Sequence, residues 1–173
     1  GGSLLIATDV NATPLTLLER LGVVRLSGVA LDSKSMFPYW DRPIPVVLTH
    51  ELTEPLVENS LAVVLSHAAP LQLNPVRGVK QAPLLKLSRS GWIERGGDLI
   101  QGAAQYDAEY DERVDALLGA AIEVSPASTL LQDTKTRARV VALGDVDMMR
   151  NELLSEIPGN KPLISNSLRW LLG

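Results

Sequence analysis

The feature that most constrains the fold is a short apolar run that ends in a glycine and two carboxylates. Val140 to Leu143 are apolar and of strand length, Gly144 breaks the run, and Asp145 and Asp147 precede an apolar helical pattern. Strand, glycine turn, acidic residue and helix is the form of a βα unit at the carboxyl edge of a parallel sheet, where ligands often bind. The two aspartates are therefore either ligand-binding residues or helix caps, and capping is the commoner outcome at such a turn.

Runs rich in Val, Ile and Leu alternate with helical patterns along the rest of the chain. The runs expected to be strands include residues 4–7, 23–26, 46–48, 61–65 and 84–87, whereas residues 74–82 are expected to be an exposed loop. Helical patterns follow Thr13, Thr53 and Asn160, which are N-cap residue types with a proline one or two positions later. Continuous apolar runs suit strands buried on both faces. We therefore predict one α/β domain over residues 1–173, with a largely parallel sheet and helices on both faces.

Composition excludes several classes of function. The net charge is −4, the pI is near 5.2, and the 16 basic residues are scattered, which argues against a nucleic-acid partner because phosphate binding needs clustered Lys and Arg. The chain has no cysteine, which removes thiol nucleophiles, thiolate metal sites and disulfides. No apolar run reaches the roughly 18–20 residues of a transmembrane helix.

The sequence lacks the motifs that an enzyme of this size usually carries. The two histidines, His50 and His67, have no metal-ligand spacing, and there is no Gly-x-Ser-x-Gly nucleophile turn. Neither glycine-rich phosphate-binding pattern is present. We therefore predict a protein that is not an enzyme and binds no metal or cofactor. His50 is interpreted as a residue that holds two loops together by hydrogen bonds rather than as a catalytic base.

One catalytic alternative remains. Asp145-Val-Asp147 after an apolar strand resembles the first motif of haloacid-dehalogenase-like phosphotransferases, in which the first Asp is phosphorylated and the second handles the leaving group around magnesium. The resemblance covers five or six residues, and it departs at Gly144 and at Met149. A magnesium-dependent phosphotransferase that uses Asp145 and Asp147 is therefore the alternative function.

A second feature is a loop rich in aromatic residues and proline. Phe37, Tyr39 and Trp40 lie within four positions of one another, and prolines flank and interrupt them. An exposed loop of this kind is typical of a contact with a protein partner or a carbohydrate. The alternative is a lid that folds back over the aliphatic core. A carbohydrate-binding module that uses this loop is a further possible function.

Three stretches together resemble the auxiliary component of uncharacterised ABC transport systems, a GldG-like, gliding-motility-type family. The first is Gly-Gly-Ser-Leu-Leu-Ile-Ala-Thr-Asp at residues 1–9, which leads to Gly22. The second is His-Glu-Leu-Thr at residues 50–53. The third and most specific is Arg-Val-Val-Ala-Leu-Gly-Asp-Val-Asp at residues 139–147, followed by Asn151, Gly159, Asn160 and residues 166–172. The departures from the family pattern are Glu51 for Pro, Val146 for Ser and Met148 for an aromatic residue.

The resemblance implies a three-layer, flavodoxin-like domain related to class I glutamine amidotransferases but without their catalytic cysteine. It also implies a periplasmic or cell-surface location in a longer membrane-anchored protein, with ABC transporter membrane and ATPase subunits as partners. We therefore expect an extracytoplasmic binding or scaffolding domain. Its candidate ligand groove is expected near Asp9, His50 and Asp145, with Asp147 and Asn151 beside it.

Overall fold

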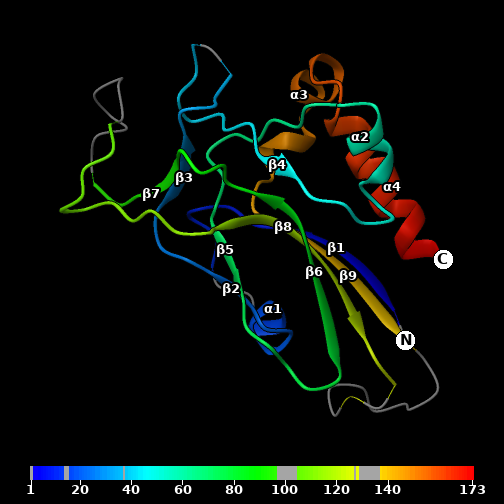
Figure 1. The fold of residues 1–173 in the computed structure, drawn as a ribbon. Helices are drawn as coiled ribbons and strands as arrows, with labels where there is room; N and C mark the ends of the chain where they lie inside the picture. Colours follow the sequence, from blue (N-terminus) through cyan, green and yellow to red (C-terminus); the bar gives the residue numbers. More distant parts are fainter. Residues whose placement is uncertain (1, 14–15, 37, 97–104, 127, 129–136) are drawn as a thin grey trace.

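The protein is built around β-strands that are connected mostly by loops, with a few helices beside them (Figure 1). The structure is a computed structural model that describes residues 2–13, 16–36, 38–96, 105–126, 128 and 137–173. The strands are β1 (Ser3–Ala7), β2 (Val23–Arg25), β3 (Val29–Asp32), β4 (Val46–Val47), β5 (Leu71–Leu73), β6 (Val79–Lys86), β7 (Gly91–Glu94), β8 (Leu117–Val124) and β9 (Ala138–Leu143). The helices are α1 (Thr16–Arg20), α2 (Glu54–Glu58), α3 (Asn151–Glu156) and α4 (Asn160–Leu172), with a 3-10 helix at Asp147–Met149.

The main sheet is mixed and mostly antiparallel. Among the described residues it has seven strands in the order β1-β9-β8-β5-β2, with β6 also paired to β8 and β4 paired to β6. Of the strand pairs described in it, β1 with β9 is parallel, with Leu5 opposite Val141, and the others are antiparallel. The sheet is strongly curled, and β3 and β7 form a separate antiparallel pair (Figure 1).

The expectation of a largely parallel, three-layer flavodoxin-like or glutamine-amidotransferase-like sheet was therefore wrong. The main error lies in residues 74–82, which were expected to be an exposed loop but contribute the first half of β6. This long strand pairs antiparallel with β8, from Val79 opposite Val124 to Lys86 opposite Leu117. Pro83 is accommodated because the register shifts beside it, and a proline is tolerated in a strand at such irregularities.

Side chains of β9 alternate between two apolar layers, as expected for a strand buried on both faces. Val141 and Leu143 pack in a cluster with Leu163 and Trp170 of α4, whereas Val140 and Ala142 pack in a cluster with α1. Helices α2, α3 and α4 gather on one side of the sheet, and the short α1 lies on the other (Figure 1). No helix in the described part of the chain is long and apolar enough to cross a membrane.

Candidate functional site

The parallel pairing of β1 with β9 brings two of the predicted site residues to one edge of the sheet. The backbone N–H of Thr8 donates to the carbonyl of Leu143 at 2.9 Å, so Asp9 and Asp145 follow neighbouring strand ends. Asp9 begins a local turn, in which its carbonyl accepts the N–H of Ala12 at 3.1 Å and its Oδ1 accepts the N–H of Val10 at 2.6 Å. Asp9 and Asp145, two residues of the expected groove, therefore follow the ends of two neighbouring parallel strands.

His50 lies elsewhere. Its ring packs edge-on against Trp170, with 5.6 Å between the ring centroids, and the guanidinium of Arg139 lies 4.9 Å from the centre of the same indole ring. Because Arg139 is the second residue of β9 and Asp145 follows the end of that strand, His50 is at the opposite end of the strand from Asp145. The structure therefore does not bring His50 together with Asp9 and Asp145 in one groove.

The contacts of His50 are those of a structural residue. Its Nδ1 accepts the N–H of Leu52 at 3.2 Å, and burial lowers the pKa of the ring. The carbonyl of Leu52 in turn accepts a hydrogen bond from the side chain of Asn166 on α4 at 3.2 Å. Glu51 accepts a hydrogen bond from the indole of Trp170. Together these contacts fasten residues 50–52 to the last turns of α4.

Asp145 is buried, and backbone donors occupy both of its oxygens. It is 1% exposed, its Oδ2 accepts the N–H of Ser66 at 2.6 Å, and its Oδ1 accepts the N–H of Asp147 at 2.7 Å. Burial raises the pKa of Asp145 to about 6, although these N–H donors favour the charged form and oppose the rise. The bond to Asp147 starts the 3-10 helix, and the bond to Ser66 ties down a distant segment.

Two glycines of the same signature also contact that distant segment. Gly144 accepts the N–H of Ala69 at 2.6 Å, and a Cβ at this glycine would lie 2.2 Å from the Ala69 carbonyl oxygen. Gly159 donates its N–H to the carbonyl of Ala62 at 2.9 Å, and a Cβ there would lie 2.4 Å from that oxygen. Real Cβ atoms do not approach backbone oxygens so closely, so only glycine fits at either position without a backbone shift.

Asn160 completes these contacts. The residue is fully buried, its Oδ1 accepts the N–H of Val64 at 3.0 Å, and its Nδ2 donates to the carbonyl of Val64 at 2.9 Å. The same Nδ2 lies 3.4 Å from the carbonyl of Met148. An asparagine amide carries an acceptor oxygen and two N–H donors. It can therefore bond both the N–H and the carbonyl of one residue, as the backbone of a neighbouring strand would.

We call residues 62–69 the clamped segment, because Gly144, Asp145, Gly159 and Asn160 hold it at four points along its length. A strand was predicted at residues 61–65, but none forms there. The segment is largely buried, and four of its residues are bound by the groups just described. Loop carbonyls of Pro43 and Asp41 accept two more of its N–H groups, and one strand residue, Ala30 of β3, donates its N–H to the carbonyl of Ala68 at 2.8 Å. Most of these bonds are made without a sheet ladder, and they supply the partners that buried backbone groups require.

Asp147 and Asn151 remain at the surface. Asp147 is half-buried, with an oxygen 3.9 Å from the guanidinium of Arg150, and Asn151 is exposed at the start of α3. In the ranges that the structure describes, no group of three or more His, Cys, Asp or Glu side chains has the geometry to hold a metal ion. Because the oxygens of Asp145 face N–H donors, they are also not directed at a common ion with Asp147.

The aromatic loop, residues 35–43, is internally bonded, and its described residues 38–40 are exposed. Tyr39 is 45% exposed and Trp40 is 47% exposed, so these two rings do not form a lid over the core. Backbone bonds run from Met36 N–H to Arg42 carbonyl at 2.9 Å and from Tyr39 N–H to Met36 carbonyl at 2.7 Å. The Arg42 guanidinium lies 4.0 Å from the centre of the Tyr39 ring. The third predicted contact residue, Phe37, lies outside the described residues.

His67 joins the aromatic loop to the clamped segment, although it was not predicted to be a site residue. His67 donates its N–H to the carbonyl of Asp41 at 2.9 Å, and its Nδ1 lies 3.0 Å from Oδ2 of Asp41. His67 has a φ of 52°, which a non-glycine residue adopts rarely and often at functional sites. It directly follows Ser66, which Asp145 holds. The spacing of 26 positions between Asp41 and His67 matches no motif, so no sequence signal pointed to this pair.

Comparisons with known proteins give a likeness in structure and no match in sequence. No protein-family model matches the chain, and no curated protein matches its sequence. Among solved structures, the chain is similar to one described as "mmIFT52 N-terminal domain", with a TM-score of 0.59 and 12% sequence identity. The match covers 100% of this chain and 66% of that one. At this identity the likeness concerns the fold alone.

Proposed function

We propose that the protein is a non-catalytic binding or scaffolding domain whose contact surface is the aromatic loop. The observation that carries the proposal is the contrast between two sites. Both oxygens of Asp145, the strongest candidate for a catalytic residue, accept backbone N–H groups. Tyr39 and Trp40, in contrast, are exposed on an internally bonded loop. Exposed aromatic rings held by a rigid scaffold are typical of binding surfaces, since little conformational entropy is lost on contact.

The cellular setting in this proposal rests on the family resemblance. It places the domain outside the cytoplasm, in a membrane-anchored protein associated with an ABC transporter, whose membrane and ATPase subunits are its partners. Four residues of the closing signature, Gly144, Asp145, Gly159 and Asn160, all hold the clamped segment. In a binding domain of this type, the signature therefore specifies a framework beneath the aromatic loop rather than a reaction.

A carbohydrate is the second candidate ligand. Beside the exposed rings of Tyr39 and Trp40, the partly exposed pair of Asp41 and His67 and the guanidinium of Arg42 offer hydrogen-bond donors and acceptors. Sugars are recognised by an aromatic ring against their apolar face together with polar groups for their hydroxyls. The phosphotransferase alternative has less support, because the nucleophile that it requires, Asp145, is buried and already bonded.

A photo-cross-linking experiment tests the proposal. A photoreactive amino acid at position 40 is expected to capture subunits of an ABC transporter from membranes of the source organism. The same group at position 110 is the control, because Tyr110 is an exposed aromatic residue on a different loop, with 58% exposure. Capture of the same proteins from both positions, or of none from position 40, would contradict a partner-binding role for the aromatic loop.

Glycan binding, followed by tryptophan fluorescence, tests whether the ligand is a carbohydrate. If a glycan from a panel quenches the tryptophan fluorescence of the protein, Trp40→Ala is expected to weaken its binding roughly 5- to 30-fold, because an exposed stacking ring contributes about 1–2 kcal/mol to such contacts. The melting temperature should stay unchanged, since Trp40 is half exposed. A panel that leaves the fluorescence unchanged, or Trp40→Ala and Tyr110→Ala weakening the binding equally, would remove carbohydrate from consideration.

A further inference from the structure

Strand β1 is the last strand of the main sheet, and within the described residues no other strand pairs with its outer backbone edge. The carbonyl of Gly2 accepts the N–H of Arg139 at 3.2 Å, and the N–H of Thr8 donates to the carbonyl of Leu143 at 2.9 Å, so both residues face β9. Successive residues of a strand direct their N–H and C=O groups to opposite sides. The backbone groups that point away from β9 therefore belong to Ser3, Leu5 and Ala7.

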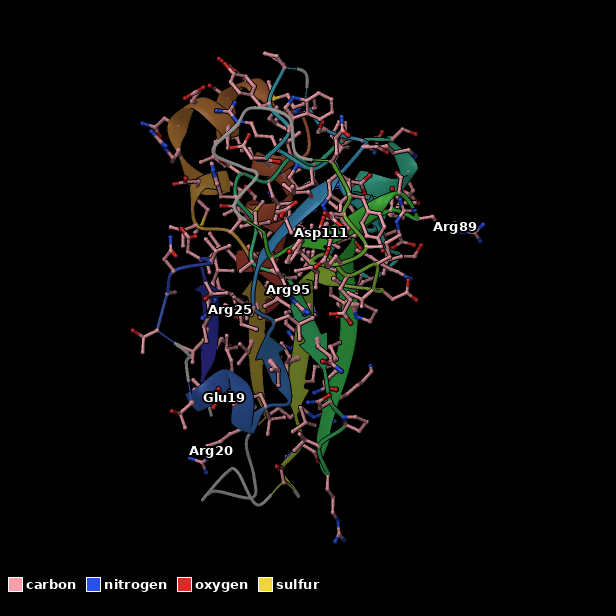
Figure 2. All side chains as sticks on the ribbon, turned by 90° about the vertical axis from the view of Figure 1, so that its left-hand side faces the viewer. Glu19, Arg20, Arg25, Arg89, Arg95 and Asp111 are labelled. Carbon is pink, nitrogen blue, oxygen red and sulfur yellow. The ribbon has the colours of Figure 1, made fainter. Side chains whose placement is uncertain are left out.

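These outward groups have no partner among the residues that the structure describes. No hydrogen bond from that part of the chain reaches them, and Figure 2 shows β1, in blue, as the outer strand on one side of the sheet. Proteins usually protect such an edge with a proline, a charged residue, a bulge or a covering element. The sequence Ser-Leu-Leu-Ile-Ala of β1 has no proline or charge, and its register with β9 has no bulge.

Exposed apolar side chains lie beside this edge. Leu4 is 47% exposed and Leu17 of α1 is 44% exposed, and with Leu21 and Val140 they line an apolar pocket of about 300 Å³ on the α1 face of the sheet. On the other face α4 packs near β1 and leaves Leu168 47% exposed. The element that fits this edge is therefore another strand with apolar side chains on both of its faces, a description that β1 itself meets.

We propose that β1 is a self-association edge, at which two copies of the chain pair their β1 strands antiparallel about a two-fold axis through Leu5. In this register Ser3 lies opposite Ala7 of the partner subunit, and Leu5 lies opposite Leu5 of the partner subunit. The three outward residues of each copy then exchange all of their N–H and C=O groups. Symmetric pairs of this kind are the commonest form of protein oligomer. This proposal is independent of the proposed function.

The charges at the two ends of β1 suit the antiparallel arrangement. Arg20 lines the pocket at the Ser3 end, projects from α1 on the same side of the molecule as β1 (Figure 2), and has no ion pair in the part of the chain described. Asp9 follows the other end of the strand. The two-fold axis brings Arg20 of one copy toward Asp9 of the partner subunit, whereas a parallel pairing would bring like charges together.

Cross-linking tests the register directly, because the natural chain has no cysteine. Ser3→Cys protein mixed with Ala7→Cys protein is expected to form a mixed disulfide-linked dimer under mild oxidation, because these positions face each other across the axis. Neither variant alone should form more than a trace of disulfide-linked dimer. Efficient linking of Ser3→Cys to itself would instead indicate a parallel pairing, and the absence of linking in every combination would overturn the proposal.

Sedimentation of the unmodified protein tests the association without a covalent bond. The wild type is expected to be a concentration-dependent dimer, and Ser3→Pro is expected to weaken it at least tenfold, because it removes an outward N–H from each copy and no bond to β9. Leu4→Lys should have a similar effect, since a charge among the exposed apolar side chains beside an edge strand opposes pairing. The matched control is Val57→Lys, on exposed α2. A wild type that stays monomeric at hundreds of micromolar, or variants that dimerise as it does, would contradict the pairing.

Discussion

Replacing Asn160 by alanine is expected to lower the free energy of unfolding by about 3 kcal/mol. The substitution leaves the N–H and the carbonyl of Val64 without a partner in a site that water does not reach, and it removes the contact to the carbonyl of Met148. Each stranded buried group costs roughly 1–3 kcal/mol. For a chain of this length the loss corresponds to a fall in melting temperature of roughly 6–12 °C. Chemical denaturation and thermal melting measure both quantities.

Matched asparagine variants separate this effect from a general sensitivity of the C-terminal region. Asn166→Ala removes one partly buried hydrogen bond, to the carbonyl of Leu52, and is expected to cost about 1 kcal/mol. Asn151→Ala changes an exposed side chain and should alter stability by less than about 0.5 kcal/mol. If Asn160→Ala cost no more than Asn151→Ala, the clamped segment would not depend on this side chain.

The second large effect is a pH dependence that comes from Asp145. Its pKa is about 6 in the folded protein, against an ordinary value of 3.8, because burial disfavours the charged form. The folded state therefore holds this proton more tightly than the unfolded state does. The contribution of Asp145 to stability is highest below pH 4 and falls as the pH rises to 6, by about 3 kcal/mol in total.

Asp145→Asn removes the titration but keeps the shape of the side chain. The loss in free energy of unfolding that the substitution causes should be about 3 kcal/mol smaller at pH 7 than at pH 4. The reason is that only the wild type bears the buried charge at pH 7. Denaturant unfolding of both proteins at the two pH values measures the difference. A difference of the opposite sign would mean that a cation or metal lowers the pKa of Asp145, as the phosphotransferase alternative requires, and would count against its role in the clamp.

Local sequence signals predicted the elements whose cause is local. The strand at residues 140–143, the helix after Thr53 and the helix that begins at Asn160 form close to their predicted positions, although neither Thr53 nor Asn160 caps its helix through a side-chain hydrogen bond. The sheet topology was missed because a glycine turn after an apolar strand looks the same in a parallel and in a mixed sheet. The first half of β6 was missed because Pro75, Gly78 and two basic residues resemble a loop, whereas pairing with β8 decides its structure.

For the aspartates too, the sequence indicated the local contact but not the distant one. Composition and missing motifs favoured a capping role, and Asp145 does start the 3-10 helix through the N–H of Asp147. Its other bond, to Ser66, spans 79 positions, and the bonds from Asn160 to Val64 span 96. Such contacts depend on the complete fold, so no spacing in the sequence could reveal the clamp. The pair of Asp41 and His67 escaped notice for the same reason.

Amide hydrogen exchange at Val64 and Ser66 tests the central claim that side chains of the signature hold the clamped segment. These two N–H groups donate to Asn160 and Asp145 rather than to a neighbouring strand. The account predicts that both exchange as slowly as the amides of β9, and that Asn160→Ala accelerates exchange at Val64 far more than in β9. Exchange at Val64 and Ser66 in the wild type as fast as in the exposed aromatic loop would contradict it.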